Sequence, residues 1–316
     1  MSTTLKNGNT LLNKHDVIVS GEYPMKMLGA ILKTNILAPI HATFNITNKC
    51  QLSCPYCGLK DRDVQQQDMW LEDFVSHVQA LDQYYTLKAI TFSGGGEPLM
   101  NKQFENMVLW CTNKNYKMGL VTNGINLSSF SVSLLQEFKW IRISFDSDRK
   151  AFPKIPEGME VGVSYLYREG DEQTVVFQRL IEWAETGRIT HLRLAPDILN
   201  LTRIPDQFRH IKNVMVQDRT VQTKGTTWCW VGLVHPTIDV DGQVLPCCGT
   251  HYAIPGRQGS YPEELKMGCV EEYLAEHVTP QKPFNGDACK ICYYQQNNRF
   301  LEKVSLCKDL QNRSFV

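Results

Sequence analysis

The chain has 316 residues, of which 42% are hydrophobic and 21% are charged, and its 33 basic side chains balance 33 acidic ones. A neutral chain has no overall positive field, so its charge gives no support to binding of duplex nucleic acid. The N-terminal residues lack the apolar run of a signal peptide, and no uninterrupted stretch approaches the ~18 apolar residues of a membrane span. We therefore expect a cytoplasmic protein with no membrane partner, folded as one large domain and a smaller one.

Strand and helix patterns alternate from about residue 39 to residue 200. Strand patterns cover 39–47, 88–98 (which runs into glycines), 117–124, 140–148, 160–167 and 190–199, and helix patterns cover 70–85, 104–116, 132–138 and 175–187. This alternation predicts parallel βαβ units, arranged as an open sheet or a barrel. In either arrangement ligands gather at the carboxyl ends of the strands, so we look for site residues there.

The remaining residues divide the chain into four parts. We expect an N-terminal extension at 1–38, a catalytic domain at 39–200, a linker at 201–224 and a small metal-binding domain at 225–316. Within the last part, TIDV (237–240) and QVLP (243–246) flank Asp241-Gly242, a two-residue turn signal that predicts a β-hairpin. The rest of this part is predicted to be rich in loops.

Three cysteines, Cys50, Cys54 and Cys57, follow the first predicted strand. Clustered cysteines in a cytosolic protein more often bind metal than form disulfides. A structural zinc site requires four closed ligands, and no fourth Cys or His follows within this stretch. Three thiolates on a [4Fe–4S] cluster leave one iron open for a substrate or cofactor, so the spacing favours an iron–sulfur cluster over zinc.

The C-x3-C-x2-C spacing, with Tyr56 before the last cysteine, resembles the signature of the radical S-adenosylmethionine (SAM) superfamily. The resemblance covers about residues 39–200 and implies an α/β fold, a partial (β/α)6 TIM-like barrel. It implies that the three cysteines hold a [4Fe–4S] cluster whose open iron binds SAM. Reduction by an external one-electron donor of the flavodoxin or ferredoxin type then splits SAM into methionine and a 5′-deoxyadenosyl radical, which abstracts hydrogen from a substrate.

The same resemblance implies further contacts with SAM at later strand ends. The segment SGGGEP (93–98) has neither Gly-Lys-Ser/Thr nor GxGxxG, which argues against a phosphate-binding loop. In the superfamily a glycine-rich segment at this place pairs with the SAM amino group. The candidate SAM-binding residues are Tyr56, Gly94, Gly95, Gly96, Glu97, Ser144, Asp146 and Arg193, with Asn123 of the TNG turn as a further candidate. For the polar residues, a satisfied polar side chain of the barrel interior is the alternative.

A second set of cysteines, Cys229, Cys247, Cys289 and Cys292, lies near the C-terminus. Two cysteine pairs on a hairpin and a loop also suit a zinc ribbon. The stretch CWVGLVHPTIDVDGQVLPCC resembles the opening of a SPASM or twitch domain, and the single later C-x2-C fits the one-cluster twitch form. The resemblance implies an auxiliary [4Fe–4S] cluster on these four residues, although Cys248, Cys269 or Cys307 could replace one of them. Such a cluster suits a dehydrogenation or an isomerisation.

The sequence narrows the substrate only to an amino-acid-bearing or other small polar molecule. One alternative is a ribosomal-peptide maturase, although 38 residues before the barrel are too few for the separate leader-binding domain of many such enzymes. A second is an enzyme that modifies amino-acid-decorated nucleobases in DNA hypermodification. A third alternative, of another class, is a non-catalytic binding protein, a barrel whose cysteines hold structural zinc.

Overall fold

The computed structural model describes residues 36–59, 66–149, 152–197, 202–217, 227–250, 261–292 and 294–306. Its strands are β1 (His41–Phe44), β2 (Ala89–Phe92), β3 (Lys117–Thr122), β4 (Phe138–Phe145), β5 (Gly162–Tyr167), β6 (Leu192–Pro196), β7 (Val214–Val216), β8 (Trp228–Cys229), β9 (Thr237–Ile238), β10 (Val244–Leu245) and β11 (Phe284–Asn285). Its α-helices are α3 (Leu71–Leu81), α4 (Phe104–Asn113), α5 (Val132–Leu135), α6 (Val175–Thr186), α7 (Val231–Val234), α8 (Val270–Tyr273) and α9 (Gln295–Leu306). Short 3-10 turns and one π-helical turn, at Leu274–Val278, complete the described elements.

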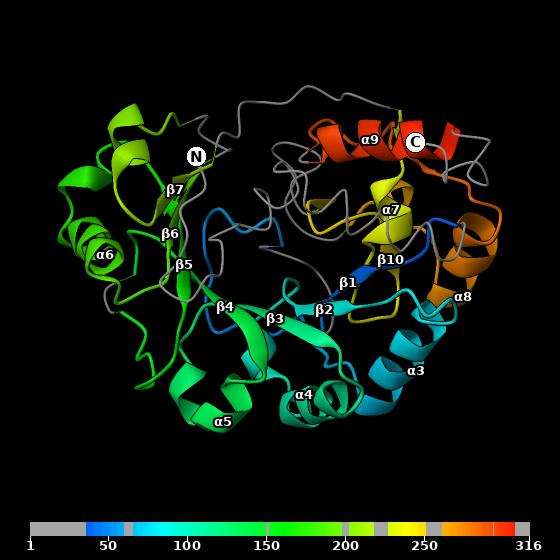
Figure 1. The fold of residues 1–316 in the computed structure, drawn as a ribbon, viewed down its shortest axis with the longest axis horizontal. Coiled ribbons are helices and arrows are strands. Elements are labelled where there is room, and N and C mark those ends of the chain that lie inside the picture. Colours follow the sequence, from blue (N-terminus) through cyan, green and yellow to red (C-terminus); the bar gives the residue numbers. More distant parts are fainter. Residues whose placement is uncertain are drawn as a thin grey trace, which may run out of the picture.

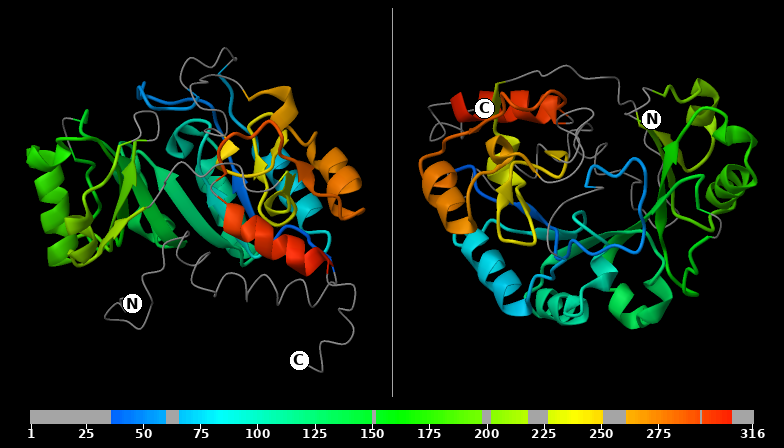
Figure 2. Two further views of the ribbon diagram at one scale, coloured as in Figure 1. Left: turned by 90° about the horizontal axis from the view of Figure 1, so that it is seen from above. Right: turned by 180° about the vertical axis from the view of Figure 1, so that it is seen from behind.

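The strands β1 to β7 form one parallel sheet in sequence order. The sheet curves, and helices α3 to α6 cover its outer face (Figure 1). Seen from behind, the helices form the outside of a ring whose inner wall is made of strands (Figure 2). This arrangement confirms the predicted α/β fold of the partial-barrel type.

The C-terminal hairpin extends the same sheet. Strand β9 pairs parallel with β1, joining Thr43 to Thr237 and Phe44 to Ile238, and β10 pairs antiparallel with β9. The predicted hairpin forms, with Gly242 at φ +80° in its turn, but pairing of Ile238 with Val244 makes that turn longer than the predicted two residues. The segment that we placed in a separate small domain therefore shares a sheet with the barrel, and its boundary at residue 225 stays a prediction.

The hydrophobic core lies between the sheet and its helices. Alternate residues of β1 and β2 point outward, and their rings pack edge to face against rings of the helices: the ring centres of Phe44 and Phe74 are 4.9 Å apart, and those of Phe92 and Phe104 are 5.6 Å apart. Because strand side chains alternate, the residues between them point to the barrel interior. There Thr43 bonds to His235 at 3.1 Å, and Asn45 donates to Asp239 at 3.0 Å. The inner face at Thr43 and Asn45 is therefore polar and buried.

Several predicted elements differ from the structure. The first helix ends at Leu81, because Asp82 caps it and accepts a bond from the Leu87 amide at 2.9 Å. The helix predicted at 132–138 is one turn long, and Phe138 starts β4, where its ring packs against those of Phe92 and Phe104. The predicted linker contains β7, which pairs with β6. Helix α9 lies in a segment that we expected to be loop.

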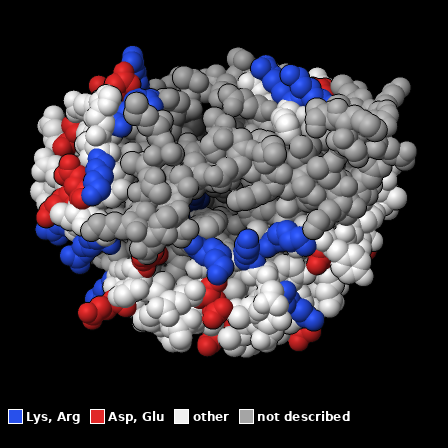
Figure 3. Space-filling model, viewed as in Figure 1, with Lys and Arg blue, Asp and Glu red and all other residues white. Residues whose placement is uncertain are grey.

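Charge is mixed on the visible surface. On the face shown in Figure 3, basic and acidic side chains of the described residues lie among uncharged ones. This agrees with the zero net charge of the chain. Among the described helices, none is both long and apolar enough to cross a membrane.

We predict that the hairpin and the barrel unfold together. Ile238 is 0% exposed in β9 beside β1, so Ile238→Ala should lower the free energy of unfolding by about 2–5 kcal/mol in a single urea transition. The control Val175→Ala, at a side chain 71% exposed, should change it by less than about 0.5 kcal/mol. Two separate transitions, with only one moved by Ile238→Ala, would contradict the shared sheet.

Candidate functional site

The loop after β1 and the glycine-rich turn after β2 pack backbone to backbone. A Cβ atom on Gly96 would lie 2.2 Å from the Lys49 carbonyl oxygen, and one on Gly95 would lie 2.9 Å from the Thr47 carbonyl oxygen. The Glu97 amide donates to the Lys49 carbonyl at 2.7 Å. The glycines are therefore required for contact with the segment that leads into the cysteines, and they hold it against the sheet.

Residues 50–57 are here called the thiol loop. Their three thiols share one environment. The Cys57 amide donates to the Cys54 carbonyl at 3.1 Å, which closes a turn, and the Leu52 amide donates to the Cys50 sulfur at 3.4 Å. Burial raises the pKa of Cys50, and the negative charges of Glu97 and of the other two thiolates raise it further. Thiolates that disfavour one another are stabilised together by bound cations, so the donor set fits an iron–sulfur cluster.

Tyr56 connects the thiol loop to the end of β4. Its hydroxyl donates a hydrogen bond to the buried carboxylate of Asp146, and the Asp148 amide donates to the same carboxylate at 2.8 Å. Burial, followed by the Asp146 bond and charge, raises the pKa of Tyr56, so the phenol stays protonated as a donor. The structure thus brings these two predicted residues together, and their contact with SAM stays a prediction.

Glu97 lies deeper than the sequence suggests. It is 2% exposed, and its carboxylate accepts from the Thr122 hydroxyl and the Asn123 amide, both at 2.6 Å. Burial raises its pKa, and these hydrogen bonds act in the opposite direction. The carboxylate therefore fixes the end of β3, and its predicted role as an acceptor for the SAM ammonium is not tested by these contacts.

The other two polar candidates, Ser144 and Arg193, lie in one row across the sheet. The register of β4, β5 and β6 places Ser144 beside Ser164 and Ser164 beside Arg193. The Arg193 guanidinium donates to the Ser164 hydroxyl at 3.1 and 2.7 Å. Both residues face the barrel interior at the height of the TNG turn, and their roles toward SAM stay predictions.

Sequence reasoning missed Arg149. Its guanidinium donates to the carbonyl oxygens of Asn123 and Ser144, and it lies 4.6 Å from the centre of the Phe145 ring. Burial lowers its pKa, whereas the charges of Asp146 and Cys54 act in the opposite direction. Arg149 thus joins the ends of β3 and β4 beside the thiol loop. A single arginine after a strand carries no distinctive sequence signal.

Arg168, from the loop after β5, is a second missed residue. It lies 5.6 Å from the centre of the Tyr56 ring and forms an ion pair with Asp148 at 2.9 Å. A positive charge over an aromatic ring helps to hold that ring in place. Only the fold reveals this contact, because the two residues are far apart in sequence.

The C-terminal cysteines also come together. Burial raises the pKa of Cys247, and the charges of Cys229, Cys248, Cys289 and Cys292 raise it further. Burial also raises the pKa of Cys229 to about 12, with smaller contributions from Cys292 and Cys289. The four predicted ligands are therefore mutual neighbours, a donor set that fits a second cluster.

The alternative ligands differ in their surroundings. The Cys248 sulfur is 3.0 Å from the Tyr294 hydroxyl, and the charge of Cys248 helps to raise the pKa of Cys247. Cys269 caps the start of α8 and exchanges bonds with Glu272. Cys307 lies outside the described residues.

Asn298 on α9 organises this region and was not predicted. Its side-chain oxygen accepts from the amides of Trp230 and Val231 at 2.8 and 2.9 Å, and its amide group donates to the Cys292 sulfur at 3.7 Å. It also lowers the pKa of Cys229 through a hydrogen bond. A buried asparagine in a polar helix gives no sign of this role before the fold is known.

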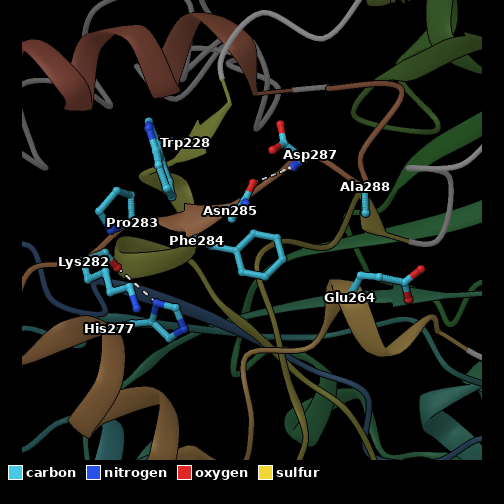
Figure 4. Close-up of a pocket in the computed structure, with 9 residues that line it drawn as sticks. All are labelled: Trp228, Glu264, His277, Lys282, Pro283, Phe284, Asn285, Asp287 and Ala288. Atoms are coloured by element: carbon cyan, nitrogen blue, oxygen red, sulfur yellow. Dashed lines mark hydrogen bonds between the residues drawn. The ribbon is translucent and has the colours of Figure 1, made fainter.

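A pocket of about 530 Å³ borders the strand pair that carries Cys229. Its walls are formed by Trp228, Glu264, His277, Lys282, Pro283, Phe284, Asn285, Asp287 and Ala288 (Figure 4). The His277 ring bonds to the Lys282 carbonyl at 3.1 Å, which holds one wall. Trp228 and Ala288 directly precede Cys229 and Cys289, so the pocket lies beside the C-terminal cysteines.

Neither group of cysteines is arranged around a single ion. Across the described parts of the chain, no three His, Cys, Asp or Glu side chains gather to hold one metal ion. A [4Fe–4S] cluster takes each thiolate on a different iron, so its ligands do not converge on one point.

Residues 44–159 match the family model of the radical SAM superfamily. The matched region includes the thiol loop, the glycine-rich turn, the TNG turn and the end of β4. The match confirms the predicted resemblance to this superfamily over this part of the chain. The match supports the expectation of an enzyme that uses SAM and a [4Fe–4S] cluster.

Two curated relatives and one solved structure are similar to this chain. The subtilosin biosynthesis protein AlbA of Bacillus subtilis is 25% identical over 72% of the chain and 47% of its own length. The SAM-dependent nucleotide dehydratase of Selenomonas ruminantium is 29% identical over 33% of the chain and 38% of its length. The structure of Streptococcus suis SuiB bound to its precursor peptide SuiA has a TM-score of 0.54, with 13% identity, 92% of the chain covered and 80% of SuiB. The chain thus spans less than half the length of each of these two relatives. The likeness to SuiB shows the fold alone.

We predict that Gly96→Ala disrupts the site by steric overlap. Gly96 has an ordinary backbone conformation, so the cost comes from overlap with the Lys49 backbone and should reach about 3 kcal/mol or more in urea unfolding. At the control position Gly170 a Cβ atom would have no neighbour within 4 Å, but the backbone has φ +88°. Gly170→Ala should therefore lower the free energy of unfolding by about 1–2 kcal/mol. A loss for Gly96→Ala no larger than that of the control would contradict the tight contact.

Proposed function

We propose that this protein cleaves SAM reductively at a [4Fe–4S] cluster held by Cys50, Cys54 and Cys57, and takes a hydrogen atom from an amino-acid-bearing substrate. The observation that supports the proposal best is the thiol loop, where three thiols share one environment and are held by the glycine turn. When bound, the cluster and SAM supply a 5′-deoxyadenosyl radical after one electron enters. A reductant of the flavodoxin or ferredoxin type would deliver that electron.

The chain's own residues position these groups. Gly95 and Gly96 fix the thiol loop against β2, and Glu97 fixes the end of β3. Tyr56 and Asp146 close the loop against β4 through their hydrogen bond. Because the Tyr56 phenol stays protonated, it holds Asp146 as an acceptor that can face the SAM ribose or ammonium group.

We also propose an auxiliary [4Fe–4S] cluster on Cys229, Cys247, Cys289 and Cys292. Its four ligands leave no iron open, which suits passage of an electron to or from a substrate radical. Asn298 supports two of these sulfurs with weak hydrogen bonds. Removal of an electron from the substrate radical corresponds to a dehydrogenation. Return of the electron to it corresponds to an isomerisation.

A peptide is the form of amino-acid-bearing substrate that the relatives favour. The Bacillus relative is named for biosynthesis of a bacteriocin, and its match extends over 72% of the chain, which includes more than the barrel. We therefore propose a peptide substrate ahead of a free small molecule or a modified nucleobase. The test is incubation with a synthetic peptide. Dehydrogenation would appear in the mass spectrum as the loss of two hydrogens from the peptide.

We predict that Cys57→Ala abolishes SAM cleavage. The variant should lose about four of about eight irons per chain and form no 5′-deoxyadenosine after reduction with dithionite. The matched control is Cys111→Ala, because Cys111 is a fully buried core residue on α4. The control should keep its iron and its cleavage. Cleavage retained by Cys57→Ala would refute the proposed SAM site.

We predict that Cys289→Ala removes the auxiliary cluster alone. About four of about eight irons should be lost while 5′-deoxyadenosine still forms without substrate. The control Cys269→Ala replaces the residue that caps α8 and should keep all irons. An unchanged iron count in Cys289→Ala, or a loss in Cys269→Ala, would contradict the proposed ligands.

A further inference from the structure

The inward-facing residues of β4, β5 and β6 form two layers. The upper layer contains Ser144, Ser164 and Arg193, near the carboxyl ends of the strands. The register of β4 and β5 places Arg142 beside Gly162 in the layer below. Two residues along a strand span about 7 Å, so Arg142 lies roughly that far beneath Ser144.

Arg142 is held in place by an aromatic ring. Its guanidinium lies 5.5 Å from the centre of the Trp140 ring. That ring occupies the space above Gly119 of β3, where a Cβ atom would come within 2.1 Å of it. The neighbouring Ile141 and Ile143 are buried in the core against the helices, so alternation directs Arg142 to the interior.

His191 completes the same layer. Its ring occupies the space above Gly162, where a Cβ atom would come within 2.2 Å, and its Nδ1 is 3.0 Å from the Thr190 hydroxyl. Burial and the positive charges of Arg142 and Arg193 lower the pKa of His191 to about 4. The imidazole is therefore neutral near pH 7, and the positive charge of this wall comes from the two guanidinium groups.

Two buried or half-buried guanidinium groups near one imidazole create a local positive field inside a neutral chain. A guanidinium group forms paired hydrogen bonds with carboxylate and phosphate groups, and burial strengthens them. The opposite wall carries Asp239, which already accepts a bond from Asn45. In these two layers the positive side of the interior therefore lies on β4 and β6, whereas the buried carboxylates of Asp146 and Asp197 follow the carboxyl ends of the same two strands.

We propose that Arg142 binds an anionic group of the substrate, a carboxylate or a phosphate, in the barrel interior, with the charge of Arg193 above it adding to the attraction. The inference rests on the proposed function, because it places the substrate beneath the thiol loop. Arg193 lies in the layer nearer the predicted SAM site, so Arg142 is the residue that distinguishes substrate from SAM. For a peptide, the anionic group is an acidic side chain or the terminal carboxylate.

The test uses the full chain, reconstituted and loaded with SAM, and three probes: N-acetylglutamate, its neutral diamide N-acetylglutaminamide, which has no carboxylate, and inorganic phosphate. Calorimetry should show binding of one anion and none of the neutral N-acetylglutaminamide. The tighter of the two anions identifies carboxylate or phosphate as the group. Arg142→Gln should weaken that binding roughly tenfold or more, and Arg142→Lys several-fold, because lysine keeps the charge but loses the paired donors.

The control is Arg203→Gln, at a side chain 87% exposed, which should bind the anion as the wild type does. Equal binding by Arg142→Gln and the wild type, or no binding of either anion, would overturn the proposal. If Arg142→Gln does not fold, unchanged affinity in Arg142→Lys overturns it. Formation of 5′-deoxyadenosine without substrate is measured in parallel: its absence in the wild type refutes the proposed function, whereas anion binding is judged separately.

Discussion

The close backbone contact between the turn after β2 and the loop after β1 is the constraint on which the site depends. Gly95 and Gly96 leave no room for a side chain against Thr47 and Lys49. From this contact a continuous set of bonds runs through Glu97 to β3, and through Arg149 from β3 to β4. The ends of four strands are thereby fixed relative to the thiols. A cluster and a bound cofactor require such pre-organisation, because their ligands must be in place before the chemistry begins.

Strand β1 connects the two groups of cysteines. Its carboxyl end leads into the thiol loop, and its free edge accepts β9 of the C-terminal hairpin. The hairpin in turn leads to Cys247, and α9 holds the region together through Asn298. Of the proposed auxiliary ligands, Cys247 is therefore joined to the thiol loop through one sheet, whereas Cys229 lies on β8 of the separate β8–β11 sheet. Electron passage between a substrate in the barrel and an auxiliary cluster benefits from such a fixed geometry.

Local patterns in the sequence predicted the parts of the fold that depend on local physics. The alternating patterns gave β1 to β6 and α6 with its Gly187 cap, and Asp241-Gly242 gave the hairpin. The cysteine spacing and the SGGGEP turn identified the strand ends that meet. The parallel pairing of β9 with β1 was not predicted, since a two-residue strand carries no periodic signal. Arg149 and Asn298 were missed for a similar reason, because their roles depend on partners distant in sequence.

The central claim is best tested by anaerobic reconstitution of the wild-type chain with iron and sulfide, followed by dithionite and SAM. The account predicts 5′-deoxyadenosine together with about eight irons per chain, four for each cluster. Zinc at about two per chain with no 5′-deoxyadenosine would contradict it, because both sets of thiols would then be structural zinc sites.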